Sequence, residues 1–154
     1  MSEKPSSRPI LVPVDFSPHS TAALLKAGEI AQCMQLPITV LHVVHDPADM
    51  PGYYTKIAKK KTLVRIEDLA SEMFDKFMQE SISRHPELKS LKKASTLLVL
   101  GLPVTRILQI AKKINASMIV MGSQGRTGLK HMMLGSKAEQ IVRLSPVPVT
   151  IVKK

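Results

Sequence analysis

Five short apolar runs alternate with segments of helical periodicity along this chain, and this alternation restricts the possible folds more than any other feature. The runs are rich in Val, Ile and Leu, as is typical of strands buried on both faces of a parallel sheet. Strands that alternate with helices favour an α/β fold. The sequence therefore predicts a doubly wound, five-stranded, all-parallel sheet with helices on both faces, with strands over residues 10–14, 38–44, 94–100, 118–121 and 147–152.

Capping residues and prolines predict the helix boundaries. Ser17 and Pro18 suit the N-cap and first turn of the first helix, and Pro37 requires that helix to end before it. Apolar residues three and four positions apart predict further helices over 56–85 and 104–115. Ser136 and Glu139 have the spacing of a capping box for the last helix. The residues of that helix expected to face inward are Ala138, Ile141, Val142 and Leu144.

Charge and composition indicate the kind of partner. The net charge is +10 at pH 7 over 154 residues, which suits an anion such as a nucleotide, a nucleic acid or an acidic protein. Aromatic residues make up only 3% of the chain, so surfaces for base stacking are scarce and nucleic-acid binding is not expected. The length fits one domain over 1–154, with a polar tail at 1–8.

The expected compartment is the cytosol. The first residues lack the apolar core of a signal peptide, and no apolar run approaches the ~18 residues of a membrane span. The single cysteine, Cys33, agrees with a reducing compartment. Cys33 falls on the first predicted helix, where we expect it to be a small buried hydrophobe.

Glycines at 122, 125, 128 and 135 follow the fourth apolar run and precede the last helix. A strand that breaks at glycine and continues as a helix forms the kind of turn at which open α/β sheets bind ligands. Glycine lets the backbone approach a ligand without a Cβ, and a helix N-terminus adds free N–H groups, so phosphate is the expected ligand. The residue order is neither that of a Walker A loop nor that of the GxGxxG fingerprint.

The spacing G-x2-G-x9-G-S from Gly122 to Ser136 resembles the nucleotide-binding loop of the universal stress protein family. The resemblance covers nearly the whole chain, from ILVPVDFS through VLHVV and the GLP of 101–103 to SPVPVTIV. It implies a strand order of 3-2-1-4-5, with a crevice between the first and fourth strands. It also implies ATP as the ligand. Mg²⁺ or Mn²⁺ is expected only as a companion of the phosphates, since the sequence shows no cluster of protein ligands for a metal.

The same resemblance implies which residues bind the nucleotide. The Asp15 carboxylate would lie near the ribose hydroxyls, and the backbone of Val43 would meet adenine. The full set consists of Pro13, Val14, Asp15, Val43, Met121 and Gly122 around adenosine, and of Gly125, Gly135, Ser136 and Lys137 around the phosphates.

Several of these residues have structural alternatives. Asp15 also suits a strand end or a cap of the first helix, and Ser136 suits an N-cap, which does not exclude phosphate binding. Lys137 stands where the family often has a small apolar residue, so its ammonium either pairs with a terminal phosphate or points to solvent. Arg126 and Lys130 remain open between phosphate contacts and ordinary loop charges.

Two functions compete. The first is a cytosolic, ATP-binding regulatory or stress-response module in which nucleotide occupancy sets conformation or the choice of a protein partner. The second is a slow ATPase or phosphotransferase that uses the same site, yet the sequence shows no Walker B strand and no kinase motif, and His131 is as suited to packing as to acting as a base. A flavin-binding or PP-loop domain is disfavoured because no SGGxDS loop follows the first strand. We expect slow or absent turnover.

The last strand bears on assembly. The family resemblance implies a homodimer through residues 147–152. Independently, VPVTIV would form a sheet edge with unpaired backbone groups, which antiparallel pairing with a second copy would cover. On this basis charges at Val149 and Ile151 are expected to give monomers.

Overall fold

The computed structural model describes residues 7–45, 66–125 and 133–154. Along the chain the elements are β1 (Ile10–Pro13), α1 (Pro18–Met34), β2 (Ile38–Val44), α3 (Ile66–Arg84), α4 (Lys89–Lys92), β3 (Ser95–Leu100), α5 (Pro103–Lys113), β4 (Met118–Gly122), α6 (Ser136–Leu144) and β5 (Val149–Val152).

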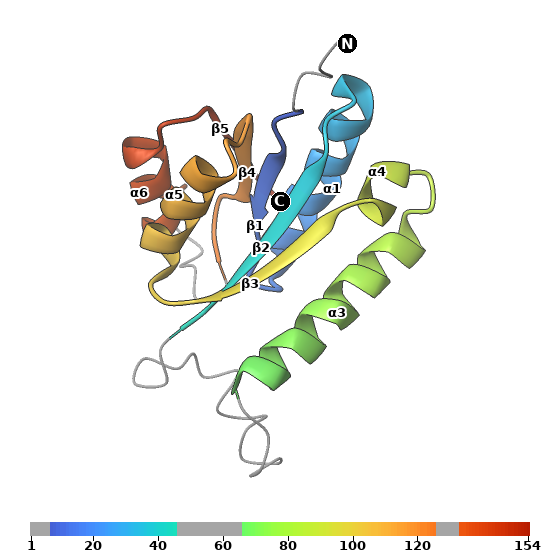
Figure 1. Cartoon of the computed structure of the whole chain (residues 1–154), viewed down its shortest axis with the longest axis horizontal. Helices are drawn as coiled ribbons and strands as arrows, with labels where there is room; N and C mark the ends of the chain where they lie inside the picture. Colours follow the sequence, from blue (N-terminus) through green and yellow to red (C-terminus); the bar gives the residue numbers. More distant parts are fainter. Residues whose placement is uncertain (1–6, 46–65, 126–132) are drawn as a thin grey trace, which may run out of the picture.

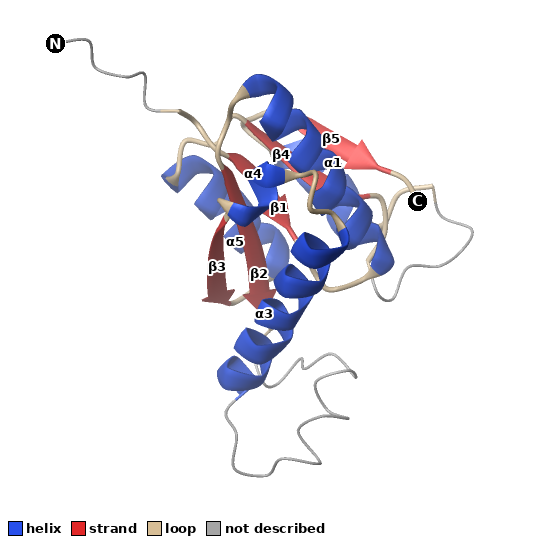
Figure 2. Ribbon diagram, turned by 90° about the vertical axis from the view of Figure 1, so that its right-hand side faces the viewer, coloured by secondary structure: helices blue, strands red, loops and turns tan. Residues whose placement is uncertain are grey.

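The strands form one parallel sheet in the order β3-β2-β1-β4-β5, which confirms the predicted fold and strand order. Strand β1 is central, with Ile10 beside Ile38 of β2 on one side and beside Met118 of β4 on the other. Helices α1, α3 and α4 cover one face of the sheet, and α5 and α6 cover the other (Figures 1 and 2).

Each face of the sheet has its own buried core, because successive strand residues point to opposite faces. Ile10 and Val12 of β1 pack towards α1, whereas Leu11 between them packs towards α5 and α6. All three side chains have no exposed surface. Burial of β1 on both faces explains why its sequence is a continuous apolar run rather than an alternating one.

Helix α1 begins and ends as its sequence predicts. The Ser17 hydroxyl accepts a hydrogen bond from the Ser20 N–H at 3.2 Å and so caps the first turn, with Pro18 as the first helical residue. At the other end Gln35 adopts a left-handed conformation, φ 56° and ψ 40°, and the chain leaves the helix before Pro37.

Three predictions about the helices are wrong. Gly135 is the N-cap of α6 and Ser136 is its first helical residue, so Ser136 and Glu139 form no capping box. Val142 and Leu144 are 46% and 62% exposed, because the inward stripe of α6 consists of Ala138 and Ile141. Cys33 is exposed rather than buried, since the buried face of α1 passes through Ala27 and Ala31 instead.

The remaining differences concern boundaries. The first and last strands are shorter than predicted, ending at Pro13 and beginning at Val149. Pro13 has no N–H, yet the Val14 N–H still donates to Leu41 O at 2.8 Å, so β-type pairing continues one residue beyond the strand. The predicted helix over 56–85 corresponds to α3 from Ile66 onward, and its first ten residues lie outside the described part of the chain.

No helix within 7–45, 66–125 or 133–154 is both long enough and apolar enough to cross a membrane.

Adjacent residues of α6 test its orientation. Ile141 has no exposed surface, whereas Val142 is 46% exposed. Ile141→Ala should lower the free energy of unfolding by about 2–5 kcal/mol, because it leaves a cavity in the core. Val142→Ala should change it by less than about 1 kcal/mol. Urea denaturation of both variants measures the difference, and equal losses would show that α6 is rotated from the position described.

Candidate functional site

The sheet reverses its winding between β1 and β4. From β1 the chain adds β2 and β3 on one side, and from β4 it adds β5 on the other. In open α/β sheets the crevice at such a reversal, at the carboxyl ends of the two strands, is the usual ligand site. Asp15 follows β1 at this edge, and Gly122 ends β4 beside it.

The turn after β1 holds the Asp15 carboxylate in a fixed place. Oδ1 of Asp15 accepts a hydrogen bond from the Ser17 N–H at 3.0 Å, and the Asp15 N–H donates to Ser20 Oγ at 3.4 Å. Phe16 between them has φ 64°, a left-handed conformation that costs a non-glycine residue roughly 1–2 kcal/mol. This strained residue lets the chain fold back so that the carboxylate reaches the start of α1.

Aromatic side chains surround the half-buried ring of Phe16. Its ring stacks on His42 with centroids 4.3 Å apart and also lies near Phe74 and Phe77 of α3. His42 is only 2% exposed, and its Nδ1 donates to Val14 O at 2.8 Å. His42 therefore has the structural role predicted for it, since it ties β2 to the residue before Asp15.

Two glycines mark where the loop after β4 comes close to other backbone or side chains. A Cβ on Gly122 would lie 2.9 Å from the Cβ, carbonyl carbon and carbonyl oxygen of His19, so α1 packs directly on the end of β4. A Cβ on Gly125 would lie 2.7 Å from Oδ2 of Asp15. The loop backbone therefore passes next to the carboxylate, and the two predicted halves of the site meet here.

The ends of the glycine loop are tied together. The Gly135 N–H donates to Ser123 O at 2.7 Å, and the Ser123 N–H donates to Val152 O of β5 at 3.0 Å. Ser123 is buried, so both ends of the loop are anchored in the sheet. The Gly135 N–H is used in this closure, whereas the N–H groups of the next residues, in the first turn of α6, have no partner within their own helix. Residues 126–132, with Arg126, Lys130 and His131, lie outside the described residues.

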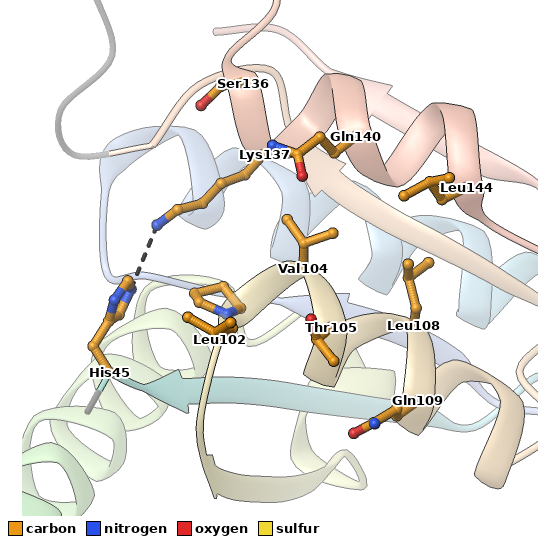
Figure 3. Close-up of a pocket in the computed structure, with 11 residues that line it drawn as sticks. His45, Leu102, Val104, Thr105, Leu108, Gln109, Ser136, Lys137, Gln140 and Leu144 are labelled. Carbon is orange, nitrogen blue, oxygen red and sulfur yellow. Dashed lines mark hydrogen bonds between the residues drawn. The ribbon is translucent and has the colours of Figure 1, made fainter. Parts of the chain in front are cut away.

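A cavity of about 820 Å³ lies between α5 and α6 and reaches the end of β2 (Figure 3). Ser136 and Lys137 line it from α6, and His45 lines it from the end of β2. Its apolar wall comes largely from α5 and the turn before it, with Leu102, Pro103, Val104 and Leu108. The volume lies within the range of sites for small molecules.

The turn before α5 is held against β2. Gly101 has φ 134°, which suits glycine and few other residues, and its N–H donates to Val44 O at 3.0 Å. Arg106 Nε donates to Leu100 O at 2.7 Å across the same turn. These bonds place Leu102, which is 63% exposed, near the end of β2.

The structure brings the predicted binding residues together only in part. Asp15 lies against Gly125, and Ser136 and Lys137 share the cavity with His45. Four further predicted residues are buried in strands, or at strand ends, that meet at this edge: Pro13, Val14, Val43 and Met121. None of their side chains lines the cavity. Sequence reasoning missed the wall from α5, although GLP at 101–103 placed a helix start at the same edge of the sheet.

Comparison with known proteins identifies the family. The family model described as universal stress protein family matches residues 6–153. The chain belongs to the universal stress protein family. Universal stress protein YxiE of Bacillus subtilis is 32% identical over 149 residues, covering 94% of this chain and 97% of that protein. The solved structure of universal stress protein UspA from Lactobacillus plantarum has a TM-score of 0.71 at 26% identity, covering 95% of this chain and 97% of that one.

Two solved members of the family are complexes with adenine nucleotides. One universal stress protein in complex with cAMP has a TM-score of 0.67 at 20% identity, covering 94% of this chain and 96% of that one. The universal stress protein of Archaeoglobus fulgidus in complex with dAMP has a TM-score of 0.59 at 21% identity, covering 95% and 98%. At these identities the likeness shows a shared fold.

The two close approaches in the glycine loop should respond differently to an added methyl group. Gly122→Ala should lower the free energy of unfolding by about 1–3 kcal/mol, because its Cβ meets the backbone of α1, which cannot move alone. Gly125→Ala should change it by less than about 1 kcal/mol, because its Cβ meets only the end of a side chain. Thermal and urea unfolding of both variants test this, and an equal or larger effect at Gly125 would contradict it.

Proposed function

We propose that this universal stress protein binds an adenine nucleotide, ATP in the first place, and acts as a cytosolic regulatory or stress-response module over residues 1–154. The observation that carries the proposal is the close approach of Gly125 to the Asp15 carboxylate. A Cβ on Gly125 would lie 2.7 Å from Oδ2 of Asp15. A carboxylate and a glycine backbone that meet at the reversal of the sheet place an acceptor for a ligand hydroxyl next to a backbone that no Cβ covers.

In the proposed pose the nucleotide lies across the ends of β1 and β4. Adenosine contacts Pro13, Val14 and Asp15, with adenine at the backbone of Val43 and the ribose beside Met121 and Gly122. The phosphates lie along Gly125, Gly135, Ser136 and Lys137. The N–H of Gly135 is bonded to Ser123 O and is not available to a phosphate. Gly135 would therefore contribute by having no side chain next to the ligand. The cAMP and dAMP complexes of relatives support an adenine nucleotide as the ligand class.

A divalent cation, Mg²⁺ or Mn²⁺, would accompany the phosphates. The described residues contain no group of three or more His, Cys, Asp or Glu side chains placed to hold a metal ion. The cation would therefore be bound mainly through phosphate oxygens and water, which is a common arrangement for Mg²⁺ with nucleotides.

Regulation through occupancy is the proposed role, rather than turnover. Phosphoryl transfer requires a positioned base or water-orienting group as well as charge stabilisation. The sequence shows no Walker B strand and no kinase motif that would supply these groups. Nucleotide bound across the Asp15 turn and the glycine loop would instead join two segments of the site and present a different surface to a partner protein.

Asp15→Asn tests the nucleotide site. The amide oxygen still accepts from the Ser17 N–H, so the turn is kept while the charge is lost. We expect the affinity for ATP with Mg²⁺, measured by titration calorimetry, to fall about 10-fold or more, because a hydrogen bond to a charged group is lost. Asp75→Asn, on the exposed face of α3, is the matched control and should bind as the parent does.

Two results would contradict the proposal. One is the absence of nucleotide binding by the parent protein after verification that no nucleotide co-purified. The other is equal binding by Asp15→Asn and the parent, which would place any nucleotide elsewhere on the molecule.

We also propose a homodimer through the free edge of β5. Pro148 O and Val152 O accept hydrogen bonds from Ile119 of β4 and from Ser123 just after it. The odd-numbered residues between them, Val149 and Ile151, therefore direct their backbone groups away from β4. Their side chains, however, pack against the core beneath α6. Charges at these positions would therefore disturb the monomer as well as the edge, and a backbone change is the sharper test.

The N–H of Val149 points away from β4, so Val149→Pro removes an edge N–H and no bond to β4. Proline is tolerated on a strand edge. The variant should sediment as a monomer with an unchanged circular dichroism spectrum. Val149→Thr has a similar shape, keeps the N–H and should remain dimeric. A dimeric proline variant would exclude pairing through this edge.

A further inference from the structure

Strand β3 forms the edge of the sheet on the side away from β5. It pairs with β2 along its whole length, and no strand within the described residues pairs with its other side. Figure 2 shows β3 at the outside of the sheet. Its sequence, STLLVL, contains no charged residue and no proline, which natural sheets commonly use to protect such an edge. The edge is therefore open to pairing with a further strand.

Alternate residues of β3 direct their backbone groups to opposite sides. The Gly101 N–H, just after the strand, donates to Val44 O at 3.0 Å, so the odd-numbered positions bond to β2. The even-numbered residues Thr96, Leu98 and Leu100 therefore direct their N–H and C=O groups away from the sheet. These outward groups have the spacing that an added strand requires.

The side chains of this edge are apolar on both faces. Leu98 packs on one face, against the cluster of Val44 and Ala70 beneath α3. Leu97 and Val99 pack on the other face, in the core that α5 and α6 cover. All three β3 side chains remain partly exposed. An added strand would place its alternate side chains beside them on each face, so apolar residues suit its centre.

Positive charges lie at both ends of β3. Lys92 and Lys93 precede the strand, and Arg106 follows it, where its Nε donates to Leu100 O at 2.7 Å. The three charged side chains are exposed. No aspartate or glutamate occurs from residue 88 to residue 138, so no acidic residue close in sequence offsets them. Acidic residues at the ends of an added strand would complement this arrangement.

The same charges disfavour a second copy of the chain at this edge. A two-fold pair of β3 strands would be antiparallel, so the start of one strand would meet the end of the other. Lys92 and Lys93 of one copy would then lie near Arg106 of the second copy. Like charges would meet at both ends of the pair, which is destabilising.

We propose that the outer edge of β3 binds an extended segment of a partner protein by strand addition, and that this segment is apolar at its centre and acidic at its ends. The outward backbone groups of Thr96 and Leu98 would pair with the segment, while Lys92, Lys93 and Arg106 would meet its carboxylates. The proposal does not depend on the nucleotide site, and its tests use the full chain without nucleotide.

Fluorescence anisotropy with labelled synthetic peptides tests the charge requirement. One peptide alternates valine and threonine between two aspartates at each end, and the other has lysines in place of the aspartates. We expect the acidic peptide to bind at least about 10-fold more tightly, and its affinity to fall when NaCl is raised to about 0.5 M. Equal binding of the two peptides, or no binding of the acidic one, would overturn the proposal.

Backbone methylation of the acidic peptide tests strand pairing without any change to the protein. A strand paired on one side uses the N–H groups of alternate residues only. Two peptides, methylated on the two alternate sets of nitrogens, should therefore differ. One should lose about 10-fold or more in affinity, and the other should bind as the unmethylated peptide does. Equal affinities of the two would mean that the peptide binds through charge alone, which contradicts strand addition.

A pair of variants at Thr96 locates the binding on β3. The N–H of Thr96 points away from β2, so Thr96→Pro removes an outward donor and no bond to β2. It should weaken binding of the acidic peptide by about 10-fold with an unchanged circular dichroism spectrum. Thr96→Val has a similar shape, keeps the N–H and should bind as the parent does. A folded proline variant with the affinity of the parent would exclude this edge.

Two double variants separate the charges at this edge from the charge of the whole chain. Lys92→Gln with Lys93→Gln should weaken binding of the acidic peptide by about 3- to 10-fold. Lys153→Gln with Lys154→Gln removes the same charge beyond β5, at the opposite edge of the sheet, and should leave the affinity unchanged. Equal losses in both double variants would contradict the proposal, because binding would then follow the net charge.

Discussion

Helix α1 passes so close to the end of β4 that position 122 has no room for a side chain. This contact sets much of the rest of the structure, because it fixes the first turn of α1 against the strand that leads into the glycine loop. The Ser17 cap and the Asp15 turn belong to that same first turn. A side chain at 122 would therefore move the helix, the carboxylate and the loop relative to one another.

The two faces of the sheet differ in a way that suits a binding protein. On one face, α1 and α3 bury a large core that includes the stacked Phe16 and His42 rings. On the other, α5 and α6 are shorter, and apolar side chains such as Leu102 and Leu144 remain exposed beside the cavity. The first face holds the Asp15 turn in place, while the second supplies the apolar wall of the cavity.

Much of the fold follows from local sequence patterns. Each strand is a β-branched or leucine-rich run, and Ser17, Pro18 and Pro37 mark the limits of α1. The start of α6 was predicted less well, because the capping box spacing of Ser136 and Glu139 competes with the closure of the loop. The Gly135 N–H bonds to Ser123 O, and this long-range contact moves the N-cap to Gly135.

The candidate site, like the fold, was predictable from the sequence only in part. The approach of the glycine loop to Asp15 was expected from the family resemblance, since it depends on strand order and on local glycines. The wall from α5 and the contact of His45 with Lys137 join residues far apart in the sequence, and no periodicity within one segment reports such a contact. Exposure of Cys33 was missed because alanines on the neighbouring stripe of α1 fill the core, which leaves the thiol face to solvent.

That exposed thiol has a practical consequence. Cys33 is the only cysteine in the chain, and it lies near the C-terminal end of α1. Because α1 rises about 1.5 Å per residue, the thiol is roughly 22 Å along the helix from the Asp15 turn. A maleimide dye or nitroxide would attach there at one place per molecule without any engineered residue. If the proposed homodimer forms, pairs of such probes would report the separation of its two copies while leaving the crevice untouched.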